Sequence, residues 1–80
     1  MPFGRIIIHT YQPGEKQKWI AFEQKVKDIL VRECFNYRGD KIKALTAAEA
    51  ELKLLVQQNP EQRDKISFHA DIAAKRFLED

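Results

Sequence analysis

The side chains best suited to metal or nucleophilic chemistry in this 80-residue chain are His9, Cys34 and His69. They lie far apart in the sequence and show none of the short spacings that zinc sites use. His9 and Cys34 would form a base and nucleophile pair only if the amino-terminal segment packed on the helix after it, and no neighbouring group activates the thiol. We therefore expect no metal site, with Cys34 serving as a small buried hydrophobe and His69 as a structural histidine.

The acidic residues follow the pattern of solvated helix faces. Seven carboxylates alternate with lysines and arginines: Glu23, Asp28, Glu33, Glu49, Glu51, Asp64 and Asp71. Modest pairing between residues one helical turn apart explains such a pattern. The glycines at positions 4, 14 and 39 are scattered and form no known phosphate-binding loop. The sequence therefore predicts a non-enzymatic protein without a cofactor.

Length and composition bound the architecture. A chain of 80 residues forms one domain, residues 1–80, that buries roughly 60% of its unfolded surface. No apolar run approaches the roughly 18 residues of a spanning helix, and Met1 to Arg5 lack the apolar core of a secretory signal. The single cysteine excludes an intrachain disulfide and suits a reducing compartment. We expect a cytoplasmic protein that does not enter a membrane.

The first expected element is a strand. Arg5 to Tyr11 is β-branched and aromatic, and Gln12-Pro13-Gly14 ends it with a turn. From Glu15 to about Phe35, apolar residues recur at steps of three and four, which predicts an amphipathic helix. Its apolar positions are Trp19, Phe22, Val26, Ile29, Leu30 and Cys34. Asn36 to Asp40 supply the turn that ends this helix, and Gly39 can take the left-handed conformation.

The second half of the chain predicts two further helices. Lys41 to Leu45 alternates polar and apolar residues, which favours a short second strand. Thr46 to Glu49 matches a capping box, so a helix should start there and end at Asn59-Pro60. A last helix within Pro60 to Leu78 places Ile66, Ala70, Ala73 and Phe77 on one face. His69 and Ile72 lie beside that face.

The predicted fold is therefore α+β, with the order β-α-(β)-α-α. The amino-terminal strand, paired or not with residues 41–45, packs on three helices because an isolated strand is unstable in water. An edge rich in isoleucine is a template for pairing with another chain. This predicts possible homodimerisation through the amino-terminal strand, with Ile6, Ile8 and Tyr11 as contacts.

Two family resemblances follow from particular residues. A proline after the initiator methionine, a strand over Arg5 to Tyr11 and a long helix from Glu15 resemble the start of the tautomerase superfamily. That resemblance implies an enzyme with Pro2 as general base, and it ends where the family requires a long second strand. It supplies a minor alternative to a non-enzymatic role.

The second resemblance covers Thr46 to Leu78. Leu45-Thr46, Glu49, Leu54-Leu55 and Asn59-Pro60, with Ser67 and the run from Asp71 to Phe77, resemble the first two helices of helix-turn-helix and winged-helix domains. The resemblance implies DNA reading by a third helix. Residues 47–80, however, carry five basic and seven acidic groups, a balance that does not suit phosphate contacts.

The basic residues lie in the first half. Residues 1–46 carry nine basic and five acidic groups, and Lys18, Lys25 and Arg32 are spaced by seven, along one ridge of the first helix. We expect a small accessory or regulatory protein that binds an unidentified protein partner, and alternatively a nucleic-acid binder without sequence specificity. The predicted partner-binding residues are Lys18, Trp19, Lys25, Arg32, Tyr37, Arg38, Lys41 and Lys43.

Overall fold

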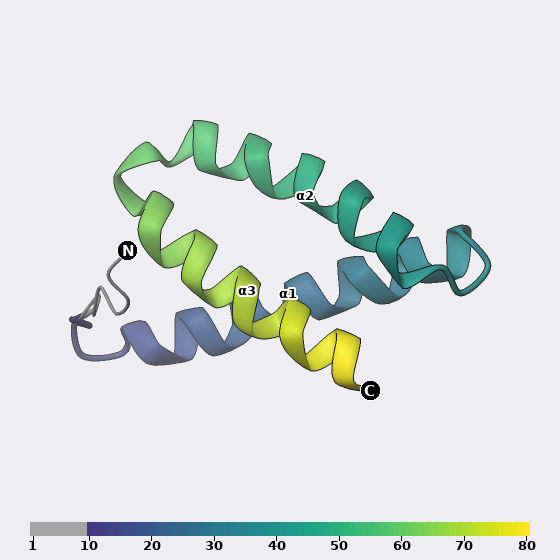
Figure 1. Cartoon of the computed structure of the whole chain (residues 1–80). Helices are drawn as coiled ribbons and strands as arrows, with labels where there is room; N and C mark the ends of the chain where they lie inside the picture. Colours follow the sequence, from purple (N-terminus) through teal and green to yellow (C-terminus); the bar gives the residue numbers. More distant parts are fainter. Residues whose placement is uncertain (1–9) are drawn as a thin grey trace, which may run out of the picture.

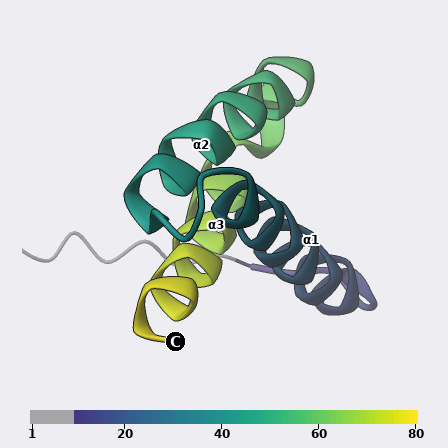
Figure 2. The same ribbon diagram turned by 90° about the vertical axis from the view of Figure 1, so that its right-hand side faces the viewer.

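The computed structural model describes residues 10–80, which form three α-helices and a short 3-10 turn (Figure 1). Helix α1 spans Glu15–Asn36, α2 spans Lys41–Gln58, turn η1 spans Pro60–Gln62 and α3 spans Arg63–Glu79. Helices α2 and α3 leave turn η1 in diverging directions, and α3 crosses α1 (Figures 1 and 2). Both α2 and α3 pack on α1, which is therefore the central helix of this part of the chain.

The predicted α+β fold is wrong, because residues 10–80 contain no strand. Apart from short connecting and terminal segments, these residues are helical. Thr10 and Tyr11, at the end of the expected first strand, have irregular structure. The rest of that strand, with Ile6 and Ile8 of the proposed dimer edge, lies outside the described residues. Pro2 and His9 also lie outside them.

The second predicted strand is also wrong, since Lys41 to Leu45 form the first turns of α2. Asp40 is the true N-cap: its side chain accepts a hydrogen bond from the Lys43 amide at 3.0 Å. Thr46, expected to cap the helix, instead lies inside it and donates its hydroxyl to the Ile42 carbonyl at 3.1 Å. Five residues of alternation are too few to outweigh a good cap and the helical spacing of Ala44, Ala48 and Leu52.

The other helix predictions are confirmed. Helix α1 covers the expected range, and each of its six predicted apolar positions is buried or half-buried. Helix α2 ends directly before Asn59-Pro60, and Pro60 opens turn η1. Helix α3 buries Ile66, Ala70, Ala73 and Phe77, as its periodicity predicts.

The main core lies where the three helices meet. Its buried members come in pairs from α1, α2 and α3: Val26 and Leu30, Ala44 and Ala48, Ala73 and Phe77. Alanine on two of the three helices allows close approach of the backbones, so the larger side chains of α1 and Phe77 fill the space between them. Among residues 10–80, no helix is long and apolar enough to cross a membrane.

Candidate functional site

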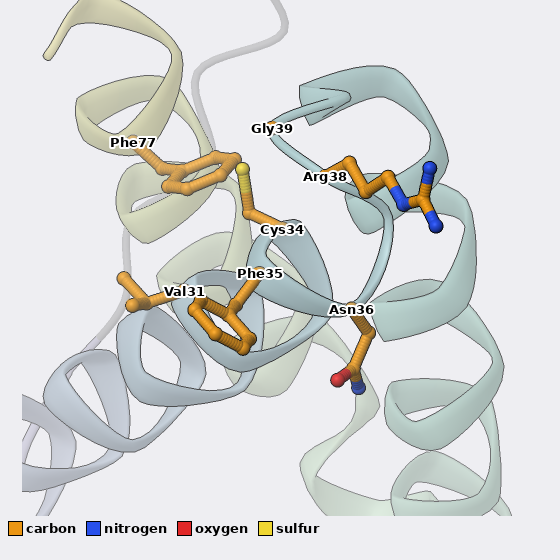
Figure 3. Close-up of a pocket in the computed structure, with 7 residues that line it drawn as sticks. All are labelled: Val31, Cys34, Phe35, Asn36, Arg38, Gly39 and Phe77. Carbon is orange, nitrogen blue, oxygen red and sulfur yellow. The ribbon is translucent and has the colours of Figure 1, made fainter.

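The most distinctive surface lies at the carboxyl end of α1, where an open depression of about 790 Å³ is found (Figure 3). Seven residues line it: Val31, Cys34, Phe35, Asn36, Arg38, Gly39 and Phe77. We call this set the α1-end pocket. Six belong to the end of α1 and the turn after it, while Phe77 comes from α3. The packing of α3 on α1 therefore completes the pocket.

The floor of the α1-end pocket is apolar. Phe77 is 6% exposed and belongs to the core, and Cys34 is half-buried against the same core. Val31 and Phe35 stand one helical turn apart on α1 and are 51% and 85% exposed. The pocket therefore joins a buried aromatic ring to an almost fully exposed one.

A tight turn ends α1 and forms one side of the pocket. The Gly39 amide donates to the Cys34 carbonyl at 2.8 Å, and the Arg38 amide donates to the Phe35 carbonyl at 3.1 Å. This pair of bonds defines a Schellman motif. Gly39 has a φ of 90°, the left-handed conformation expected from the sequence, and Arg38 also has a positive φ of 56°.

The eight predicted partner-binding residues divide by environment. Trp19 is buried at 2% exposure, and its indole packs on Phe22 and His69. Lys41 is half-buried and donates to the carbonyls of Phe77 and Asp80, at 3.0 and 2.7 Å. Both residues are therefore engaged within the fold.

The remaining residues are exposed, and one of them is paired with acidic side chains. Arg32 pairs with Glu33 and with Glu51 of α2, and these hydrogen bonds raise the pKa of its guanidinium. Lys18 donates weakly to Gln62 at 3.4 Å and lies over the Trp19 ring. The ridge of α1 is thus partly neutralised by acidic neighbours. Exposed residues without a role in the core are Lys25, Tyr37, Arg38 and Lys43.

A second cluster was missed by the sequence analysis and centres on His69, which is 8% exposed. His69 Nδ1 lies 2.6 Å from Glu23 Oε2, and Nε2 lies 2.8 Å from the Tyr11 hydroxyl. A carboxylate only accepts, so Nδ1 donates to Glu23, and a neutral imidazole then accepts the Tyr11 proton at Nε2. Arg76 donates to the other Glu23 oxygen at 3.1 Å.

This cluster orders a hydroxyl, an imidazole and a carboxylate as a catalytic triad would. The Trp19 ring, however, stacks on the imidazole at 4.9 Å, and Phe68 meets it edge-on at 5.1 Å. Both imidazole nitrogens and both Glu23 oxygens have partners within the fold. We interpret the cluster as a structural link between the segment before α1, α1 itself and α3.

The expectation that the acidic residues are solvated is wrong for Glu23, because its side chain is only 14% exposed. The position of Glu23 relative to the apolar residues of α1 could have indicated this burial. Glu23 falls four residues after Trp19 and three before Val26, inside the apolar stripe of α1. A carboxylate within such a stripe predicts a buried partner.

Glu15 makes a similar link about two turns earlier in α1. Lys65 of α3 donates to its carboxylate at 2.8 Å, the Trp19 indole at 3.0 Å and the Gln12 amide at 2.9 Å. Hydrogen bonding by Lys65, and then by Trp19 and Gln12, lowers the pKa of Glu15 to about 2. This carboxylate therefore stays ionised while it holds the start of α1 against α3.

Among residues 10–80, no group of three or more His, Cys, Asp and Glu side chains could hold a metal ion. Comparisons of the chain with protein-family models, curated proteins and solved structures found no match in any of the three.

Proposed function

We propose that this protein is a small, non-enzymatic accessory protein that binds a protein partner at the α1-end pocket. The observation that carries this proposal is Phe35, whose side chain is 85% exposed beside the apolar floor formed by Cys34 and Phe77. A single exposed hydrophobe is ordinary, but here two exposed hydrophobes border a pocket that reaches the core.

The energetics of burial support a docking role. Covering a phenylalanine side chain is worth roughly 1.5–3 kcal/mol, and aromatic anchors carry much of the binding energy of interfaces. A partner that covered Phe35 and Val31 would gain this energy and would not need to displace a side chain from the core. The cytoplasmic location that we propose keeps the half-buried Cys34 thiol in the pocket reduced.

Nucleic-acid binding by the basic residues is less well supported. Arg32, the last member of the α1 ridge, already pairs with two carboxylates, so fewer cations remain for phosphates. The floor of the α1-end pocket consists of carbon and sulfur side chains, which suit an apolar protein anchor better than a phosphate backbone.

The test uses affinity capture followed by measurements on purified proteins. Wild-type chain, Phe35→Ser and Leu54→Ser are used as bait; Leu54 is 59% exposed on α2 and does not line the pocket. A protein retained by wild type and Leu54→Ser, but lost with Phe35→Ser, is purified and titrated into isotope-labelled chain.

We expect Phe35→Ser to weaken the affinity by about ten-fold or more, and amide shifts to cluster at Val31, Cys34, Phe35 and Gly39. Thermal unfolding serves as the folding control, because both substituted side chains are exposed. Equal affinities for wild type and Phe35→Ser, or shifts located elsewhere, would overturn the proposal.

A further inference from the structure

Arg38 occupies a position that usually belongs to glycine. In the Schellman motif at the end of α1, Arg38 is the first residue after the C-cap Tyr37, and its φ of 56° is left-handed. Glycine has no Cβ and takes this conformation at little cost, whereas arginine incurs a steric penalty. The turn therefore holds a strained residue although its hydrogen bonds do not require a side chain there.

The fold makes little use of this arginine. Among residues 10–80, the Arg38 guanidinium forms no hydrogen bond or ion pair, and the residue is exposed. Its side chain extends from the rim of the α1-end pocket and away from Phe77 and Cys34 (Figure 3). Within that part of the chain, no polar interaction of this side chain offsets its strain. Strained backbone of this kind is concentrated at functional sites.

Arg38 also determines the charge of the pocket, because it is the one charged residue among the seven that line it. Nearby ionic groups are already engaged: Asp40 caps α2, and the Lys41 ammonium binds two carbonyls at the end of α3. A ligand over the pocket would thus meet an apolar floor and one guanidinium that forms no ion pair with residues 10–80. Guanidinium groups bind carboxylates through two parallel hydrogen bonds.

We propose that the α1-end pocket binds an amphipathic, acidic segment of the protein partner. An apolar side chain of that segment lies between Phe35 and Phe77, and an aspartate or glutamate pairs with Arg38. This inference rests on the proposed function and adds the chemistry of the partner. Arg38 is then the specificity-determining residue, kept at a strained position for its charge.

The probe is a random 12-residue peptide display library, selected against the full chain as wild type, Phe35→Ser and Arg38→Glu. We expect wild type to enrich peptides that combine an aromatic or aliphatic residue with Asp or Glu. Arg38→Glu should shift the enriched charge to Lys or Arg, and Phe35→Ser should enrich none of the wild-type peptides.

Synthetic versions of the enriched peptides supply the quantitative test. Replacing their acidic residue by its amide should weaken wild-type affinity by about ten-fold, because a charge-assisted pair is lost. The same replacement should leave affinity for Arg38→Gly unchanged. Arg38→Gly also serves as the folding control, since glycine removes the strain and should raise the unfolding temperature.

The outcomes separate the two proposals. If binding requires Phe35 but is indifferent to the acidic residue and to Arg38, partner binding stands and the acidic-segment inference is overturned. If wild type enriches no peptide, or if binding is indifferent to Phe35 as well, both proposals fail. A random-sequence DNA duplex that binds more tightly than the best peptide, in an Arg38-dependent manner, would overturn this inference in favour of phosphate recognition.

Discussion

Arg38 and Gly39 are adjacent residues that both have left-handed backbone conformations. We expect substitutions at the two positions to change the free energy of unfolding in opposite directions. Arg38→Gly should raise the free energy of unfolding by about 1 kcal/mol, since it removes the steric penalty of a left-handed L-residue. Gly39→Ala should lower it by about 1 kcal/mol. No atom lies within 4 Å of a Cβ added at Gly39, so the loss would come from backbone strain alone.

Urea denaturation of the two variants measures both effects. A destabilised Arg38→Gly variant would show that the arginine side chain contributes to the fold, and it would remove the argument that strain marks Arg38 as functional.

Substitution of Glu23 measures how much the buried cluster around His69 contributes to the free energy of unfolding. Glu23→Ala should lower the free energy of unfolding by about 2 kcal/mol, because it leaves the His69 Nδ1–H without its acceptor in a buried setting. Glu49→Ala is the matched control, since Glu49 is exposed, and it should change stability by less than about 0.5 kcal/mol. Chemical denaturation that gave equal values for both variants would contradict the structural role of the cluster.

The start of α2 shows how a single cap decides an element. Residues 41–45 alternate in the manner of a strand, yet Asp40 binds the Lys43 amide and the helix begins at Lys41. Burial then follows the helical period: Ala44 is fully buried, while Ile42 is 68% exposed. The alternation of polar and apolar residues at this position is a coincidence of composition and is not the pattern of a sheet.

This cap can be tested against the one expected from the sequence. Asp40→Ala should lower the free energy of unfolding by about 1 kcal/mol, the typical value of an N-cap. Thr46→Ala should be neutral within about 0.5 kcal/mol, because the threonine lies inside the helix, where alanine is the better helix former. The opposite ranking, measured by thermal and urea unfolding, would restore the capping box at Thr46.

Over the whole molecule, α3 is tied to the start of α1 by ionic links that respond to pH. The folded-state pKa of Glu15 is about 2, below its ordinary value of 4.5. A lowered pKa means that the carboxylate stabilises the fold above about pH 4.5, and that this contribution is lost as the pH falls towards 2.

Glu15→Gln should therefore differ most from wild type near neutral pH, and the difference should shrink steadily between pH 4.5 and 2. Urea midpoints across this range measure it, with the exposed Glu61→Gln as control. A difference between wild type and Glu15→Gln that did not change with pH would show that the link to Lys65 does not depend on the ionised carboxylate.

Features that depend on neighbours along the chain could be predicted from the amino-acid sequence. The period of apolar residues defined α1 and α3, Asn59-Pro60 ended α2, and Gly39 marked a left-handed turn, because helix formation and its termination act over a few residues. Cys34 and Arg38 were already singled out, but their common pocket was not, since Phe77 reaches it only from α3.

Which helix faces meet could not be predicted from periodicity and is seen in the packing of the three helices. Packing of α3 on α1 buries Glu23 with His69, removes Trp19 from the surface and leaves Phe35 exposed. The physical reason is that burial is a property of contacts between distant segments, whereas periodicity reports only that a face is apolar. The same packing turns the end of α1 into a pocket with Arg38 at its rim.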